Sequence, residues 1–319
     1  MSLLQLRVAR RRQAAADVCS LELVAPGNIL LPAFTAGAHV DIHLRGGLVR
    51  SYSLCDAPGE NRRYRIAVLR EQASRGGSAA VHALREGDVV SVGQPRNHFE
   101  LSPDAGHHLL LAGGIGITPL LAMAHWLTRQ QASFALHYSA RSRDRAAFVS
   151  EVRESFGTRA HLYFDEDGPS QRLPLSDVLA GCDPTTHLYV CGPGTYIEWV
   201  LETARAARWS EARLHREHFA APTKPGGDPG SSAFEVQIAS TGRIIQVPSD
   251  RSVAEMLHAS GIELPVSCEQ GICGTCIVGV LDGTPDHRDA FLTPAELAAN
   301  DRFTPCCSRA RSPRLVLDL

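Results

Sequence analysis

The sequence predicts a multidomain chain: an antiparallel β-barrel, then an α/β domain with a parallel sheet, then a small C-terminal domain. Residues 1–103 alternate apolar and polar side chains in short runs, whereas residues 104–222 alternate strand-like with helix-like segments. Residues 223–232 form a Pro/Gly/Ser-rich linker that precedes residues 233–319. The length of 319 residues suits two or three domains, and the 44% apolar content supplies their cores.

The barrel is predicted from short segments bounded by Gly, Pro and Asp, which is typical of strands joined by tight turns. The expected strands are Leu3–Ala9, Val18–Val24, His39–Leu44, Val49–Leu54, Tyr64–Leu69 and Val89–Val92. A helix near Ser78–Arg85 is expected to interrupt them.

Two stretches of this domain suggest phosphate or ring binding. Residues 50–53 read RSYS, in which arginine can grip a phosphate and tyrosine offers a flat face to a ring. Residues 75–78 read RGGS, a glycine turn that opens a helix and leaves N–H groups for an anion. Taken alone, each stretch is more typical of an ordinary strand end or an N-capped helix.

The second domain is predicted as a parallel sheet covered by helices. Its expected strands are His107–Ala112, Ser133–Tyr138, Ala160–Phe164 and His187–Val190. One expected helix follows Gly113–Pro119 and ends near Gln130. Three further helices are expected near Ala146–Ser155, Leu175–Leu179 and Tyr196–Arg205.

Two turns of this domain follow strands, where α/β proteins bind ligands. Gly113–Pro119 is not a G-x-G-x-x-G fingerprint, yet its glycines let a pyrophosphate approach the backbone at a helix N-terminus. Pro119 suits the first helical turn. Cys191-Gly192-Pro193 follows a later strand, and its cysteine is equally typical of a packed core.

The last domain is expected to start with a hairpin, Phe234–Ala239 and Arg243–Val247, and to contain a helix that Ser252 opens and Gly261 stops. A strand at Ile277–Leu281, a capping box at Thr293–Glu296 and a final strand at Leu315–Leu319 follow.

A cysteine-rich loop dominates this domain. Cys268, Cys273 and Cys276 stand in a C-x4-C-x2-C arrangement, and Cys306 supplies a fourth thiolate. This spacing is typical of a plant-type [2Fe–2S] centre, whereas structural zinc sites usually present C-x2-C or C-x2-H pairs. Gly271 and Gly274 remove Cβ atoms where the loop must turn tightly. Because Cys307 is adjacent to Cys306, the fourth ligand stays open on spacing alone.

Charge and composition narrow the class of partner. The formal net charge is −2 without a long basic run, which argues against nucleic acid and membrane surfaces. No apolar run approaches the length of a membrane span, and the Met1 end lacks a signal-peptide core. Nine cysteines, four of them in a reducible site, argue against a disulfide scaffold. We therefore expect a cytoplasmic protein.

Seven motifs in order carry a resemblance to a known family: RSYS at 50–53, RGGS at 75–78, PRNHF at 95–99, GGIGITP at 113–119, CGP at 191–193, EHF at 217–219, and SCEQGICGTC at 267–276 with CCSRARSPRLVLDL at 306–319. Together they resemble the phthalate dioxygenase reductase family, which includes reductase components of vanillate demethylases. The resemblance covers essentially the whole chain. It implies a flavin-binding barrel, a ferredoxin-reductase-like nucleotide domain and a β-grasp [2Fe–2S] ferredoxin domain.

The resemblance also implies site residues. For FMN these are Arg50, Ser51, Tyr52, Ser53, Val68, Arg70, Gly77, Ser78 and Phe219. For the pyridine nucleotide they are Gly113, Gly114, Gly116, Thr118, Pro119, Ser139, Arg141, Cys191, Gly192 and Pro193. The expected catalytic residues are Ser53, Cys191 and Glu217. The family tail maps its fourth ligand onto Cys306 and puts Cys307 where an aliphatic residue is common.

The implied activity is an NADH-dependent electron relay. Hydride would pass from NADH to FMN, and single electrons would then pass through the cluster to a Rieske-type oxygenase acting on an aromatic or similar small substrate. Three arginines in residues 139–145 could instead accept the 2′-phosphate of NADPH, or form a solvated basic face. Other interpretations are a donor to another class of monooxygenase, a ferredoxin-type carrier without flavin activity, and a zinc-stapled structural protein.

Overall fold

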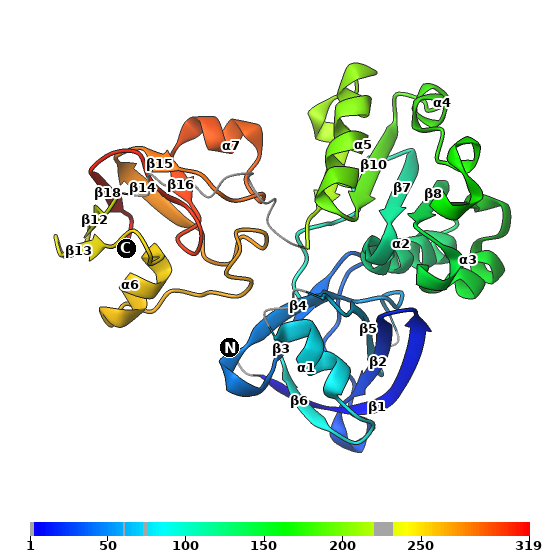
Figure 1. Ribbon diagram of the computed structural model, residues 1–319, viewed down its shortest axis with the longest axis horizontal. Coiled ribbons are helices and arrows are strands. Elements are labelled where there is room, and N and C mark those ends of the chain that lie inside the picture. The colour runs from blue at the N-terminus through cyan, green and yellow to red at the C-terminus, as the bar shows by residue number, and fades with distance from the viewer. Residues whose placement is uncertain (1–2, 60, 73–75, 220–231) are drawn as a thin grey trace. The chain divides into compact units, whose positions relative to one another are not determined.

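The computed structural model describes residues 3–59, 61–72, 76–219 and 232–319 (Figure 1). The chain divides into two compact units, Met1–Glu217 and His218–Leu319. The first unit contains a barrel-like sheet and a parallel sheet, and the second contains the cysteine-rich loop. Within the described residues, no helix is both long and apolar enough to cross a bilayer.

The barrel-like sheet has the strand order β4-β3-β6-β1-β2-β5, and each adjacent pair is antiparallel. The strands are β1 (Leu4–Ala15), β2 (Val18–Val24), β3 (His39–His43), β4 (Val49–Ser53), β5 (Tyr64–Leu69) and β6 (Val89–Val92), and helix α1 covers Gly77–Ala83. Alternate side chains such as Leu6, Val8, Val40 and Ile42 form its buried core. This confirms the predicted antiparallel barrel.

Strand β1 is longer than predicted because it continues as a ribbon with β2 up to the pair Ala15 and Val18. Three consecutive arginines, Arg10–Arg12, interrupt the apolar alternation in this part of the strand. A pattern-based assignment therefore ends too early.

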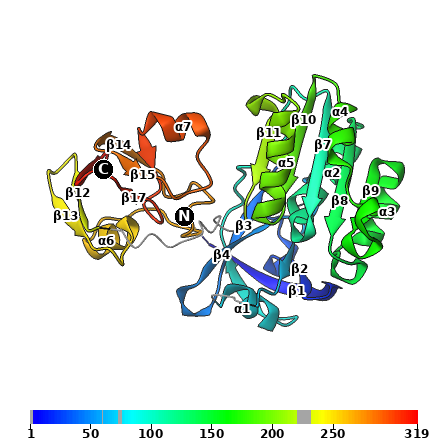
Figure 2. The same ribbon diagram turned by 45° about the horizontal axis from the view of Figure 1, so that its top comes forward.

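The parallel sheet has the order β11-β10-β7-β8-β9, and Figure 2 shows these five strands side by side. The strands are β7 (His107–Gly113), β8 (Phe134–Ala140), β9 (Ala160–Phe164), β10 (Thr186–Cys191) and β11 (Leu214–Glu217). The helices are α2 (Ile117–Arg129), α3 (Val149–Phe156), α4 (Leu175–Ala180) and α5 (Gly194–Ala206). Strand β11 was not predicted from the sequence, because the strand is short and its four residues, LHRE, are mostly polar.

Both faces of the parallel sheet are covered, as such sheets require. Helices α2 and α3 share one buried cluster with Leu110 and Tyr189, and that cluster also takes in barrel residues such as Phe99. Helices α4 and α5 share the other cluster with Leu109 and Leu111.

Polar contacts also join the barrel to the parallel-sheet part. Arg65 of β5 donates two hydrogen bonds to Glu151 of α3, at 2.8 and 2.7 Å. The Tyr189 hydroxyl of β10 accepts from the Ser102 backbone at 2.8 Å.

The second unit contains a sheet of order β13-β12-β18-β14-β16. Its strands are β12 (Phe234–Ile238), β13 (Ile244–Val247), β14 (Val278–Asp282), β16 (Arg302–Phe303) and β18 (Arg314–Leu317), while β15 (Pro285–Asp286) pairs with β17 (Arg309–Ala310). Helices α6 (Val253–Ala259) and α7 (Pro294–Ala299) begin at the predicted caps. Ser252 and Thr293 each form a full capping box with the glutamate three residues later.

Candidate functional site

The carboxyl ends of four parallel strands meet at one edge of the first unit. Cys191 ends β10 and is the register partner of Ala112 on β7 and of Glu217 on β11. Gly113 at the end of β7 is likewise the partner of Ser139 on β8. Open α/β sheets bind ligands at this edge, so the structure brings these predicted residues together where a nucleotide would lie.

The two predicted glycine turns touch each other at this edge. A Cβ atom on Gly116 would lie closer than 3.0 Å to the Cys191 carbonyl group, so only glycine lets the turn before α2 approach β10. Gly192 in turn lies against Gly113. On the opposite side, nothing lies within 4 Å of where a Gly114 Cβ would be, so the loop backbone is open to a ligand there.

Thr118 and Pro119 face inward rather than toward this opening. Both are buried, and the Thr118 hydroxyl donates to the Ile115 carbonyl at 3.0 Å. These two residues therefore fix the start of α2, and the backbone of the loop is what a ligand can reach.

Several buried polar atoms near this edge lack a hydrogen-bond partner within the described residues. They include Glu217 Oε2, and also Ser139 Oγ and the Tyr196 hydroxyl oxygen, whose mutual interaction only partly offsets the rise that burial causes in the Tyr196 pKa. Tyr196 lies against Gly113, so its hydroxyl belongs to the same region. Unpartnered buried polar atoms are rare in native proteins, and a bound polar ligand would satisfy them.

Glu217 is the most perturbed of these groups. Burial raises its pKa to about 8, and the Ser53 hydroxyl on β4 opposes this rise as a hydrogen-bond partner. Burial, and then the charge of Glu217, raise the pKa of the Cys191 thiol. Ser53, Cys191 and Glu217 thus gather at the edge where the barrel meets the parallel sheet, and at neutral pH the two acids are mainly protonated.

The RSYS strand presents its side chains in two directions. Tyr52 packs against the barrel core, and burial raises its pKa. Arg50 lies against the start of α1, where a Cβ on Gly77 would come closer than 3.0 Å to the arginine side chain. Ser51 points the other way and donates to Asp41 at 2.7 Å. The structure therefore brings Arg50 to the predicted glycine turn at Gly77.

The remaining predicted flavin residues are less uniform in placement. Val68 is buried in the barrel core, whereas Arg70, two residues later in the sequence, is exposed. The Ser78 hydroxyl accepts from the Glu71 backbone at 3.1 Å. Phe219 is part of the second compact unit and is 37% exposed, and Arg75 of the RGGS motif lies outside the described residues.

The cysteine loop of the second unit has the local geometry expected for a cluster. Cys268, Cys273 and Cys276 are buried, and the Gln270 and Ile272 backbones donate to Cys268 Sγ at 3.4 and 3.5 Å. Hydrogen bonds from the thiols of Cys273 and then Cys306 lower the pKa of Cys268.

Gly271 and Gly274 have φ values of +71° and +67°, which side chains rarely adopt. Added Cβ atoms would also come closer than 3.0 Å to Cys307 and to the Phe291 ring, respectively. The expected need for glycine at both turns is therefore confirmed.

The two adjacent cysteines contact each other but differ in their other partners. Hydrogen bonds with the thiols of Cys268, Cys276 and then Cys307 raise the pKa of Cys306. Cys307 also interacts with Thr304 Oγ1 at 3.2 Å and with Ser308 Oγ at 3.8 Å. A cluster of two irons needs two pairs of thiolates, and this loop with Cys306 supplies four thiols. Within the described ranges, no group of three or more His, Cys, Asp or Glu side chains is arranged to hold a metal ion.

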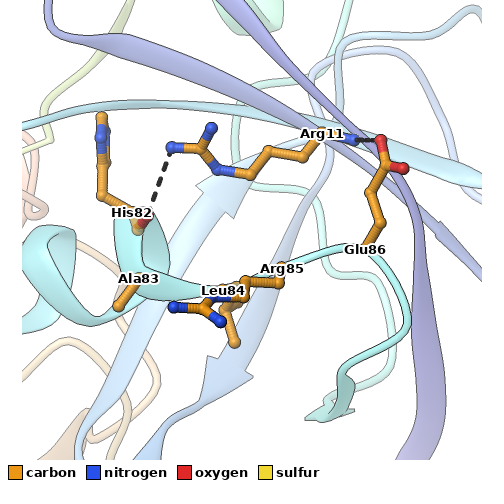
Figure 3. Close-up of a pocket in the computed structure, with 6 residues that line it drawn as sticks. All are labelled: Arg11, His82, Ala83, Leu84, Arg85 and Glu86. Atoms are coloured by element: carbon orange, nitrogen blue, oxygen red, sulfur yellow. Dashed lines mark hydrogen bonds between the residues drawn. The ribbon is translucent and has the colours of Figure 1, made fainter.

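A hollow of about 550 Å³ lies elsewhere, between β1 and the end of α1. Figure 3 shows Arg11 in it, bonded to the His82 carbonyl and to Glu86. It is lined by Arg11, His82, Ala83, Leu84, Arg85 and Glu86, none of which is a predicted site residue.

Comparisons with known proteins decide the family. The 2Fe-2S iron-sulfur cluster binding domain matches residues 236–311, and the N-terminal domain of dimethylamine monooxygenase subunit DmmA-like proteins matches residues 94–214. Vanillate O-demethylase oxidoreductase from Pseudomonas sp. (strain HR199 / DSM 7063) is 52% identical over 99% of this chain and 100% of its own. The crystal structure of phthalate dioxygenase reductase is 35% identical with a TM-score of 0.77, covering 100% of this chain and 98% of its own.

The chain belongs to the phthalate dioxygenase reductase family. The predicted fold class is confirmed, and so is the predicted enzyme class, an oxidoreductase. An intact type IV self-sufficient cytochrome P450 monooxygenase is also similar, at 36% identity and a TM-score of 0.86 over 99% of this chain. This chain spans only 41% of that P450 chain, so the same reductase fold occurs there as part of a longer protein.

Reasoning from the sequence of this family member missed several polar residues of the site. Asp41 lies opposite Ser51 on β3, and Tyr196 lies on α5 beside Gly113. Glu166 and Asp167 follow β9 and bind Arg143, which follows β8. None of these stands in a recognisable motif, and they come together only when the sheet and its helices fold.

Proposed function

We propose that the chain is the NADH-dependent reductase component of a Rieske-type oxygenase or demethylase system that acts on aromatic substrates. Residues 1–103 would form the FMN domain and 104–222 the coenzyme domain, while 233–319, after the linker 223–232, would form the ferredoxin domain. The observation that carries this proposal is the meeting of Ser53 from the barrel with Cys191 and Glu217 from the parallel sheet. A flavin on the barrel would there face a nicotinamide on the sheet.

The proposed flavin site uses the outer strand of the barrel. Arg50 and the turn at Gly77 and Ser78 would hold the FMN phosphate, since a guanidinium and the N–H groups at the start of a helix both suit an anion. Tyr52 and Ser53 would line the ring, and Phe219 would cover it. The raised pKa of Glu217 keeps a neutral carboxyl group beside this ring, which avoids placing a buried charge there.

The proposed coenzyme site uses the edge of the parallel sheet. The backbone of Gly113–Gly116 and the start of α2 would hold the pyrophosphate, and Cys191–Pro193 would flank the nicotinamide. Buried Cys191 presents a small neutral side chain there, so the protein positions the ring and needs no general base.

The proposed relay converts two-electron into one-electron chemistry. When bound, a flavin accepts a hydride and releases single electrons, whereas a [2Fe–2S] cluster accepts one electron at a time. Cys268, Cys273, Cys276 and Cys306 would hold the cluster, and Gly271 and Gly274 let their loop bend around it. None of the nine cysteines, all of which the structure describes, forms a disulfide, which suits a reducing compartment, so we place the protein in the cytoplasm.

The similarity to vanillate O-demethylase oxidoreductase along the whole chain supports a demethylase or oxygenase acceptor, which we propose to be of the Rieske type. The similarity to the cytochrome P450 monooxygenase supports a second candidate, in which the acceptor is a haem. Mixing the reduced protein with a purified Rieske oxygenase or with a P450 haem domain, and comparing the two reduction rates, separates these candidates.

The variant Cys273→Ser tests the serial order of the relay. It should lose the cluster and the reduction of cytochrome c, but keep NADH-dependent reduction of ferricyanide at the flavin. Loss of both activities with FMN still bound would contradict the proposal. Cys182→Ser is the matched control, because this thiol lies at the end of α4 and donates to the Val178 carbonyl.

A further inference from the structure

The turn that follows β8 is where a dinucleotide-binding sheet reads the adenosine ribose of its coenzyme. In such sheets, an acidic residue there binds the free 2′-hydroxyl, or an arginine binds a 2′-phosphate. Residues 139–145 carry three arginines and one aspartate, so the sequence alone suggests a phosphate site. The structure shows what each arginine already binds.

Arg143 is paired with two carboxylates from the turn after β9. Its two guanidinium nitrogens donate to the two oxygens of Asp167 at 2.6 and 2.7 Å, and Nη1 also donates to Glu166 at 3.1 Å. The Arg143 backbone donates to Glu166 at 2.9 Å, and the guanidinium lies 4.6 Å from the Phe164 ring centre. A bidentate pair of this kind uses the fork that would otherwise grip a phosphate.

Arg145 is also engaged. Its guanidinium lies 3.8 Å from Asp17 at the tip of the β1–β2 ribbon, and the Ala16 backbone donates to the Asp144 carbonyl at 2.6 Å. Arg141 is exposed and has no ion-pair partner among the described residues. Contacts with the turn after β9 and with the β1–β2 ribbon therefore hold this turn in place. Of its three arginines, only Arg141 lacks an ion-pair partner among the described residues.

Neighbouring elements also change the sign of the local charge. The turn itself has a net charge of +2, from three arginines and one aspartate. Asp17 and the three acids of Asp165–Asp167 add four negative charges, and Arg172, 3.2 Å from Asp165, adds one positive charge, which gives −1. A 2′-phosphate, with a charge near −2, would therefore enter a region that repels it.

We infer that Glu166 and Asp167 select the coenzyme, by sequestering Arg143 and so denying it to the 2′-phosphate of NADPH. This inference rests on the proposed coenzyme site and names the residues that set its specificity. Removing the two carboxylates should release Arg143 and convert the turn into a phosphate site.

The test compares the wild type with Glu166→Gln, Asp167→Asn and the double variant. Calorimetric titration with 2′,5′-ADP and with 5′-AMP measures the phosphate effect without any electron transfer. We expect the double variant to gain about tenfold in affinity for 2′,5′-ADP relative to 5′-AMP, as one released ion pair would supply. The ratio of kcat/KM for NADPH to that for NADH, with ferricyanide as acceptor, should rise in parallel.

Two controls isolate the role of Arg143. Asp165→Asn removes the same charge from the same turn but releases Arg172, so its effect should be well below that of Asp167→Asn. Adding Arg143→Ala to the double variant should cancel the gain. Equal effects of Asp165→Asn and Asp167→Asn, or an unchanged ratio in the double variant, would overturn the inference.

The outcome is separable from the proposed function. If wild-type protein oxidises neither coenzyme, the proposed function fails, yet the two adenosine phosphates still report on the turn. If the wild type oxidises NADH, but Glu166→Gln and Asp167→Asn both keep the wild-type ratio of affinities for 2′,5′-ADP and 5′-AMP, only the inference fails. The single variant Glu166→Gln keeps the test available should the double variant not fold.

Discussion

Cys191 and Glu217 are register partners on adjacent parallel strands, and both acids are held protonated at the same end of the sheet. Burial raises the pKa of each group because it disfavours the charged form. At neutral pH the proposed cofactor edge therefore carries little charge from these two groups. This neutrality has consequences that can be measured.

Replacing Glu217 by Gln should remove a pH-dependent loss of stability. The carboxyl pKa is about 8 in the folded state and 4.5 when unperturbed, so the folded state binds the extra proton between these values. Wild-type stability should fall as pH rises from about 4.5 through 8, by roughly 1–3 kcal/mol. Thermal unfolding of the apoprotein at pH 5.5 and pH 9 measures this. The Glu217→Gln melting temperature should gain on wild type at pH 9; parallel curves would count against a buried neutral carboxyl.

Cys306 and Cys307 should differ sharply when each is replaced by Ser. Cys306 contacts two other cluster thiols, whereas Cys307 interacts with Thr304 and Ser308. We expect Cys306→Ser to lose most of its iron and its visible cluster absorption, and Cys307→Ser to keep both. Iron and sulfide analysis on purified protein checks this. A cluster retained in Cys306→Ser but lost in Cys307→Ser would reverse the assignment.

Gly116→Ala should impair coenzyme binding more than folding of the barrel. The added methyl group would collide with the Cys191 carbonyl and push the loop away from β10. We expect a cost of about 1–3 kcal/mol in stability and at least a tenfold rise in KM for NADH. Gly194→Ala is the matched control, because no atom lies within 4 Å of its Cβ position. Equal KM values in the two variants would show that the close approach is unimportant.

Glu151→Gln should loosen the contact between the barrel and the parallel-sheet part. Although burial opposes it, hydrogen bonds from Arg65 and then from His125 lower the Glu151 pKa to about 2. Its contribution is therefore present above the unperturbed pKa of 4.5 and is lost as pH falls toward 2. We expect the variant to lose about 1–2 kcal/mol at pH 7 and much less at pH 3. Urea unfolding at both pH values tests this, and an equal loss at pH 3 would contradict the ionic origin.

Local patterns were sufficient for most of the fold. Apolar alternation placed β2, β5 and β9, and the capping boxes at Ser252 and Thr293 placed two helices, because these features depend on neighbours in sequence. The continuation of β1 and the short β11 were missed, since pairing with other strands stabilises them more than their own composition does.

In the candidate site, too, features set by neighbouring residues could be predicted from the sequence, and features set by the fold could not. The cysteine spacing and the glycine turns stand in the sequence, and the structure gives Gly271 and Gly274 the backbone that only glycine adopts readily. The partners of Arg143 could not be predicted from the local sequence, because Glu166 and Asp167 lie in the turn that follows the neighbouring strand β9. The neutral state of Glu217 likewise depends on burial that arises only on folding.

The most direct test of the relay is an anaerobic titration of the purified protein with NADH, followed by visible absorbance and low-temperature EPR. The account predicts that the flavin bands bleach and that a rhombic signal of a reduced [2Fe–2S] cluster appears in the same sample. Flavin bleaching without a cluster signal, in protein shown to contain two irons and two sulfides, would contradict electron transfer through Cys268, Cys273, Cys276 and Cys306.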